Sequence, residues 1–232
     1  MTSSPTTEKV IPYALLGMTA VTGLVDAVSF LSLGRVFTAN MTGNIVLLAF
    51  ATAHISGLST ARSLTALLAF LVGATLGGRV VAPANPDSQI QFAAQAFLLE
   101  VAFLLAASFC GIGYRVDLLE TSFQPFALIA LTALAMGTRN AAVRKLAIPD
   151  LTTTVLTLTV TGIGADSSFA KGNNPRLSRR FQSVTAMFVG AALGAVVIHH
   201  SISASLGLAT AMSAVCGAAL FRSVRGSHKL PA

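Results

Sequence analysis

Charged residues are scarce in this chain and are missing altogether from long stretches of it. They make up 10% of its 232 residues, and residues 181–221 contain no Asp, Glu, Lys or Arg at all. Since a membrane-spanning helix needs about 20 apolar residues, this stretch predicts two helices that turn near residues 199–201. No polar stretch is long enough to fold alone, which excludes a soluble domain with a membrane anchor.

The patterns needed for several kinds of chemistry are also missing. The sequence contains no His-Glu-x-x-His, no Gly-x-Ser-x-Gly and no phosphate-binding loop, so we expect neither an enzyme nor an ATP-driven pump. Cys110 and Cys216 each lie in an apolar run, which argues against a disulfide framework or a metal site. We therefore expect no metal and no cofactor.

The net charge of +7 could suit nucleic acid, but its distribution does not. Lys and Arg flank the apolar runs and do not alternate with aromatic residues, which is typical of membrane topology. With a mean hydropathy of +0.77, the chain is expected to have the lipid bilayer as its partner and no nucleic acid.

Eight apolar segments are present. The second and the sixth are polar and rich in threonine, and the 14 residues of the sixth are too few for a core of about 30 Å at about 1.5 Å per residue. We expect an all-α, polytopic helical membrane protein, one integral membrane domain over 1–232 with polar tails at 1–10 and 222–232. The segments lie near residues 11–33, 41–57, 63–82, 92–113, 124–143, 151–164, 181–199 and 203–221.

The distribution of Lys and Arg tests whether the two polar segments cross the membrane. If all eight segments cross, the side that holds both termini has ten of the fifteen basic residues. If the second and sixth enter and return, that side has twelve, and the other side has only Arg35, Arg62 and Arg115. Because basic loops favour the cytoplasm, we predict six full spans, two broken or re-entrant elements and cytoplasmic termini.

Two sequence matches indicate an internal repeat. Residues 72–81 and 189–198 are identical at six of ten positions at an offset of 117, and residues 23–27 match 137–141 at an offset of 114. Chance similarity among small residues is the alternative. Half-repeats near 11–113 and 124–221, each with three full spans, must be inserted in opposite orientations. Inverted repeats of this kind build secondary transporters, with the site near the bilayer midplane.

The second segment is entered through a polar, glycine-broken run. In hydrocarbon every backbone N–H and C=O must find a partner, so such a break persists only where it is buried in protein or lines a cavity. Hydrogen bonding between helices by the same side chains is the alternative. The candidate substrate- or ion-binding residues of this break are Thr38, Asn40, Thr42, Gly43 and Asn44.

A carboxylate lies within the first apolar segment, where a charge is costly unless it faces protein or water. Asp26 shares a helical stripe with Thr22 and Ser29, which suits a substrate or proton site or, alternatively, a helix-packing hydrogen bond. The repeat places Asn140 at the equivalent position, next to Arg139. We include both among the candidate binding residues, with an ion pair between Asp26 and Arg139 as a hypothesis.

The sixth segment offers a counterpart to the first break. After Pro149, helix-capping side chains are supplied by Asp150 and by Thr152, Thr153 and Thr154, and Thr157 follows one turn later. Thr154 and Thr157 are therefore candidate binding residues, with helix–helix hydrogen bonds as the alternative.

Three further features lie outside these breaks. Glu100, within the fourth segment, is a second candidate for a proton or cation ligand. Gly73-x-x-x-Gly77 and Gly190-x-x-x-Gly194 allow helices to approach closely, either within the bundle or between protomers of a homo-oligomer.

Several motifs resemble the bacterial YoaK-like membrane family, which is classed as a domain of unknown function. They are Gly23-Leu-Val-Asp-Ala27, Phe37-Thr-Ala-Asn-Met-Thr-Gly-Asn44, Gly137-Thr-Arg-Asn-Ala141 and Pro149-Asp-Leu-Thr-Thr-Thr154. The second-half motif departs from the family pattern just after Pro149–Thr154, since Leu158 follows Thr157 where glycine is expected. The resemblance covers nearly the whole chain. It implies a bacterial inner-membrane protein of about six spans, and it lends no substrate.

We therefore expect a secondary transporter or permease of an unknown small solute or ion, with its site between the two repeats. A non-transporting structural or regulatory membrane protein is the first alternative, and a channel is the second.

Overall fold

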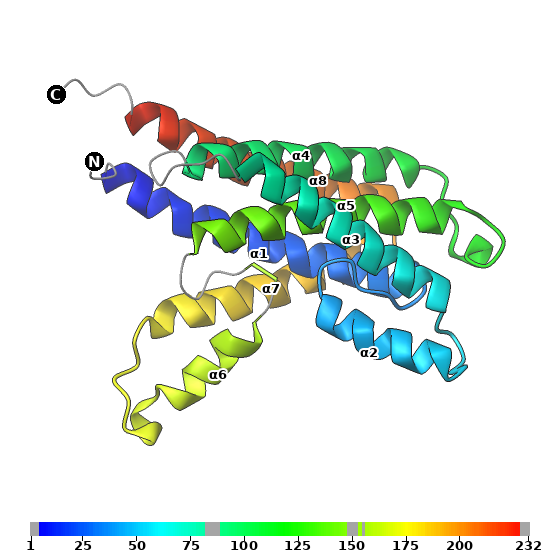
Figure 1. Cartoon of the computed structure of the whole chain (residues 1–232), viewed down its shortest axis with the longest axis horizontal. Helices are drawn as coiled ribbons and strands as arrows, with labels where there is room; N and C mark the ends of the chain where they lie inside the picture. The colour runs from blue at the N-terminus through cyan, green and yellow to red at the C-terminus, as the bar shows by residue number, and fades with distance from the viewer. Residues whose placement is uncertain (1–4, 82–88, 148–152, 155, 228–232) are drawn as a thin grey trace.

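Six long helices form the body of the protein. The computed structural model describes residues 5–81, 89–147, 153–154 and 156–227, and every regular element in these residues is a helix (Figure 1). Each long helix contains an apolar stretch of 19 to 23 residues, enough to cross a bilayer. The predicted polytopic helical membrane fold is confirmed. These helices are α1 (Pro5–Ser32), α3 (Thr60–Val81), α4 (Gln89–Cys110), α5 (Gln124–Leu146), α7 (Leu177–Val197) and α8 (Ile202–Ser227).

Two α-helices are much shorter: α2 (Met41–Thr52), with 12 residues, and α6 (Thr157–Ala165), with 9. Two 3-10 helices of three residues each, Val116–Leu118 and Ser168–Ala170, lie in the connections after α4 and α6. At about 1.5 Å per residue α2 and α6 are about 18 Å and about 14 Å long, roughly half of a hydrocarbon core. They occupy the two segments in which the sequence predicts broken elements. Residues 151, 152 and 155 of the second one lie outside the described residues.

The chain path places both short helices on the same side of the bundle. After α1 the chain turns back to the middle of the bundle, and from there α2 runs to the end opposite the termini (Figure 1). After α5, helix α6 lies on the same side of the bundle as α2 and runs back to the end where both termini lie (Figure 1). The starts of α2 and α6 therefore lie near mid-depth, and the two helices diverge towards opposite ends.

The glycine motifs are used within the bundle. A Cβ atom at Gly73 or Gly77 of α3 would collide with the backbone of Leu134 or Thr138 on α5. Thr138 Oγ1 also donates to the Gly73 carbonyl oxygen at 3.1 Å. Glycine is required where two helix backbones approach this closely, because any side chain would separate them. Gly190 and Gly194 of α7 contact the backbone of α1 in the same way, at residues 20 and 24.

Two helices are central. Of the apolar stretches, 67% of that in α1 and 61% of that in α5 is buried, against 22% in each of α3 and α7. Their apolar side chains fill the core together with residues of α4 and α8, including Leu24, Leu104, Leu128 and Leu206.

Helix extends into both of the predicted polar tails. Helix α1 begins at Pro5 and α8 ends at Ser227, so parts of 1–10 and 222–232 are helical. Residues 1–4 and 228–232 lie outside the described part of the chain.

Candidate functional site

Asp26, in the second half of α1, holds the returning chain in the middle of the bundle. Its Oδ1 atom accepts hydrogen bonds from the backbone N–H groups of Thr38 at 3.0 Å and Ala39 at 2.8 Å. These two amides precede the first turn of α2, so the carboxylate satisfies donors that have no partner within a helix. Asp26 thereby fixes the point at which α2 begins.

Amide side chains complete this start. Asn40 is the N-cap of α2, and its Oδ1 accepts from the Gly43 N–H at 3.3 Å. Asn44 is fully buried and binds the backbone of Phe37 on both sides: its Oδ1 accepts from the Phe37 N–H at 2.9 Å, and its Nδ2 donates to the Phe37 carbonyl oxygen. The polar run is thus a turn fixed by side-chain hydrogen bonds, and it directs α2 outward from mid-depth.

The start of α6 is held to the equivalent region of α5. Thr154 Oγ1 donates to Asn140 Oδ1 at 2.5 Å, and Asn140 Nδ2 donates to the Met136 carbonyl oxygen at 2.9 Å. The prediction that the threonines cap α6 is wrong. The N-cap of α6 is Leu156, whose side chain cannot accept a hydrogen bond from the first turn. Pro149, Asp150 and Thr152 of that prediction lie outside the described residues.

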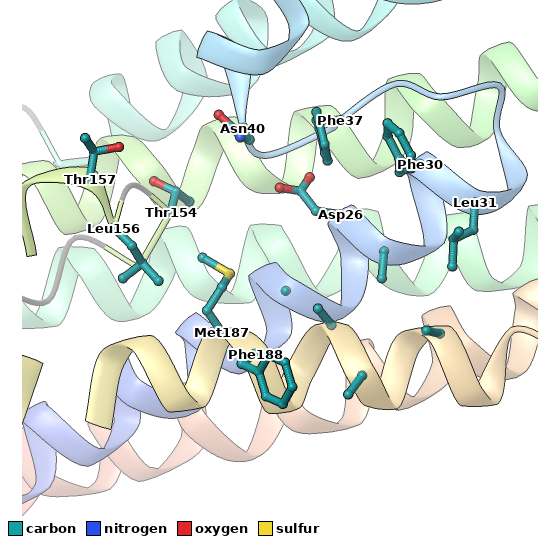
Figure 2. A pocket seen from close by; sticks show the side chains of 15 residues that line it. Asp26, Phe30, Leu31, Phe37, Asn40, Thr154, Leu156, Thr157, Met187 and Phe188 are labelled. Carbon is teal, nitrogen blue, oxygen red and sulfur yellow. The ribbon is translucent and has the colours of Figure 1, made fainter. Parts of the chain in front are cut away.

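A cavity of about 640 Å³ lies between these two starts and α7 (Figure 2). Asp26 and Asn40 line it on one side, Thr154 and Leu156 at the end nearest α6, and Met187 projects into it from α7 (Figure 2). Most of the wall is apolar, and a few polar groups converge on one region, which is the usual composition of a small-molecule site. The other lining residues are Gly23, Ala27, Phe30, Leu31, Phe37, Thr157, Phe188, Ala191, Ala192 and Ala195.

The candidate residues divide into three groups. Asp26, Asn40, Thr154 and Thr157 line the cavity, whereas Thr38, Asn44 and Asn140 shape the backbone around it. Thr42 is exposed, and Gly43 lies against the Phe37 ring, so neither lines this cavity. Arg139 does not line the cavity either, because its side chain is buried in the core of the bundle.

The hypothesis of an ion pair between Asp26 and Arg139 is wrong. Arg139 is completely buried among α1, α4 and α5, where its Nη1 lies 3.2 Å from Glu100 Oε1. Its Nη2 donates to Thr22 Oγ1 at 2.6 Å. The physical reason is helix geometry: neighbouring residues project about 100° apart, so Asn140 faces α6 while Arg139 faces the core.

Sequence reasoning missed the hydrophobic wall of the cavity. Phe30 and Phe37 stack with their ring centroids 5.0 Å apart, and both line the site. Phe37 belongs to the polar run and could have been found by its proximity to Asn40. Met187 lies one turn before Gly190, so the Gly190-x-x-x-Gly194 motif marks its face of α7 as a close-packing one, but nothing in the sequence indicates that this face adjoins α1. Phe188 has no such signal.

The comparisons with known proteins give a family and no assigned function. Residues 14–219, well over half of the chain, match the family described as "Protein of unknown function (DUF1275)". The chain belongs to this family. It is also similar to the UPF0700 transmembrane protein YoaK of Bacillus subtilis (strain 168), with 39% identity over 156 residues. The resemblance to YoaK-like proteins is thereby confirmed.

The similarity to YoaK covers 67% of this chain and 65% of the relative's length. No solved structure matches the chain.

Proposed function

We propose that this protein is a secondary transporter or permease for a small solute, which binds in the cavity between the starts of α2 and α6. The observation that carries the proposal is the cavity itself. It has a volume of about 640 Å³, contains the Asp26 carboxylate and is bounded by two helices that begin at mid-depth. Discontinuous helices that meet near the midplane are how many transporters build their substrate sites.

The two halves of the chain are proposed to be an inverted repeat, and glycine contacts support this. Gly23 on α1 packs against the backbone of Met187 on α7, and Gly137 on α5 packs against the backbone of Phe70 on α3. The two glycines are 114 residues apart and their two partners are 117 apart, which are the offsets of the sequence matches. A chance match between small residues would not relate two separate helix contacts.

Helix burial supports the same repeat, in which α1 corresponds to α5, α3 to α7 and α4 to α8. The buried fractions of the apolar stretches are 67% and 61% for α1 and α5, 22% for both α3 and α7, and 39% for both α4 and α8. The short helices α2 and α6 run to opposite ends of the bundle (Figure 1). Two halves inserted in opposite orientations have this arrangement, and their interface is where alternating access takes place.

The protein is proposed to reside in the bacterial inner membrane with both termini in the cytoplasm. Arg139 is buried and belongs to no loop, which leaves eleven basic residues at the terminal end against three at the other. That asymmetry still favours a cytoplasmic terminal end. An ion gradient or facilitated diffusion is the proposed driving force, since the sequence has no ATP-binding motif.

Uptake into proteoliposomes tests the function. The purified full-length chain is reconstituted and exposed to a panel of labelled cationic, neutral and anionic solutes, and the initial rates are compared with those of Asp26→Asn and Asn40→Ala. We expect saturable uptake of at least one solute by the wild type and a loss of that uptake in Asp26→Asn. Asp117→Asn is the matched control, because it makes the same substitution at an exposed position between α4 and α5, in the 3-10 helix Val116–Leu118.

The alternatives give different results. A structural or regulatory membrane protein gives equal traces for all variants and for empty liposomes. A channel gives uptake that rises with concentration without saturating.

Accessibility to a membrane-impermeant maleimide tests the topology. In a cysteine-free background, Ser56→Cys should react from outside intact cells and Asn173→Cys only after lysis, since these exposed positions lie at opposite ends of the bundle. Reaction of both positions from the same side would eliminate the inverted repeat.

A further inference from the structure

The cavity has one formal charge among the lining residues that the structure describes, the carboxylate of Asp26. The other polar groups in this part of the wall are an amide, Asn40, and two hydroxyls, Thr154 and Thr157. Inside a low-dielectric protein, a single fixed negative charge attracts cations and repels anions far more strongly than in water. The charge of the cavity therefore selects against anionic solutes.

The carboxylate is fixed in position. The two backbone amides that donate to Asp26 Oδ1, from Thr38 and Ala39, hold the side chain at the cavity wall and stabilise its negative charge. A preorganised charge loses little entropy when a ligand binds, so it discriminates more sharply than a mobile surface carboxylate.

The walls beside the carboxylate are aromatic and apolar. Phe30 and Phe37 form a stacked pair next to Asp26, and Met187 and Leu156 face them across the cavity (Figure 2). The faces of aromatic rings attract organic cations, and methionine adapts to apolar groups of irregular shape. These walls suit an apolar or aromatic body attached to a positively charged nitrogen.

The site offers a multivalent metal ion one charged ligand, the Asp26 carboxylate. Metal ions need several oxygen ligands at short range, and no group of three or more His, Cys, Asp or Glu side chains that could hold one occurs in the described part of the chain. A volume of about 640 Å³ instead falls within the range of drug-sized ligands, about 300–1,000 Å³.

From the fixed carboxylate, the paired aromatic rings and the volume we infer that the solute is a small organic ammonium ion with an apolar or aromatic group. Its nitrogen binds at Asp26 and its apolar part lies against Phe30, Phe37 and Met187. This inference names the substrate class of the site and rests on the proposed transport function.

The test measures binding and uptake separately with three probes that share a ring and chain: 2-phenylethylamine, 2-phenylethanol and phenylacetate. Titration calorimetry of the full-length protein in detergent should detect binding of the amine alone. Asp26→Asn keeps an oxygen that can accept from Thr38 and Ala39 but removes the charge, so it should weaken amine binding by at least about tenfold. Asp117→Asn should not change it.

Aromatic variants test the second half of the inference. Phe30→Leu should weaken amine binding by about two- to thirtyfold, the range that cation–π contacts contribute. Phe126→Leu is the matched control, since Phe126 stacks with Phe123 outside the cavity. Thermal melting of each variant establishes that it is folded.

The outcomes separate the inference from the proposed function. Amine binding without uptake in proteoliposomes supports the ligand class and refutes transport. Uptake of the alcohol or the carboxylate in preference to the amine supports transport and refutes the ligand class. Failure of the wild type to bind the amine, or equal binding by wild type and Asp26→Asn, also overturns the inference.

Discussion

Breaking the buried ion pair between Glu100 and Arg139 should destabilise the protein more than any other single polar substitution in the core. Both side chains are completely buried, and the pair connects α4 with α5. Arg139 also donates to the Met18 carbonyl oxygen at 3.0 Å and to Thr22 on α1, while Ser213 on α8 donates to Glu100 Oε1 at 2.8 Å. One pair of charges therefore links four spans.

The magnitude follows from what each substitution leaves behind. Arg139→Met leaves the Glu100 carboxylate buried without its counter-charge. Glu100→Gln likewise leaves the Arg139 guanidinium buried without a carboxylate partner. Removal of one partner of a buried pair costs about 3–5 kcal/mol. At about 2–4 °C per kcal/mol for a chain of this size, the melting temperature should fall by about 6–20 °C. The double variant Glu100→Gln/Arg139→Met leaves neither charge of this pair unpaired in the core and should be more stable than either single variant.

Thermal melting in detergent, followed through labelling of the half-buried Cys110 and Cys216 by a thiol-reactive dye, measures these shifts. Thr22→Val is the matched control, because it removes one hydrogen bond from Arg139 and leaves both charges paired. Such bonds contribute about 0.6 kcal/mol in a membrane protein. Additive losses in the double variant, or single variants no less stable than Thr22→Val, would refute the reasoning.

Two further predictions concern helix packing and the loop between α4 and α5. Gly77→Ala should lower stability by about 1–3 kcal/mol, because its Cβ would collide with Thr138, whereas Gly78→Ala, whose Cβ meets nothing within 4 Å, should leave the melting temperature unchanged or raise it; equal melting of the two variants would contradict the close contact of α3 with α5. Burial raises the pKa of Tyr114 to about 12, and its hydroxyl donates to the Ser32 carbonyl oxygen at 2.6 Å, so in a Tyr13→Phe background the absorbance of tyrosinate should reach half its final value near pH 12. The neutral form is the one favoured by folding, so this contribution to stability is complete below about pH 10 and is lost as the pH rises through 12; half-ionisation near pH 10 would count against the buried hydrogen bond.

Much of the fold could be predicted from sequence because the bilayer limits which backbone structures can cross it and how long they must be. Length and apolarity predict the six spans, and the polar residues around Asn40 predict a break, since an unpaired backbone is too costly in lipid. The basic residues favour re-entry of the two short segments over crossing. These inferences depend on local composition and on a solvent whose thickness is known.

The partners of buried side chains could not be predicted in the same way. Asp26 and Arg139 are plausible partners by charge, but the structure pairs Arg139 with Glu100 and gives Asp26 two backbone amides. Which faces of α1 and α5 meet their neighbours depends on close packing at glycines, with Gly23 of α1 against α7 and Gly137 of α5 against α3, and this packing involves residues distant in the sequence. The apolar wall from α7 depends on the same contacts.

The shortness of α2 and α6 also sets the order in which the protein can be built. Helical membrane proteins insert stable spans first and associate them afterwards. With 12 and 9 residues, neither short helix can insert as a span, so both enter the protein only as the long helices come together. The cavity is consequently assembled last during biogenesis. A substitution at Asn44 can therefore leave insertion, topology and yield unchanged and still abolish the site.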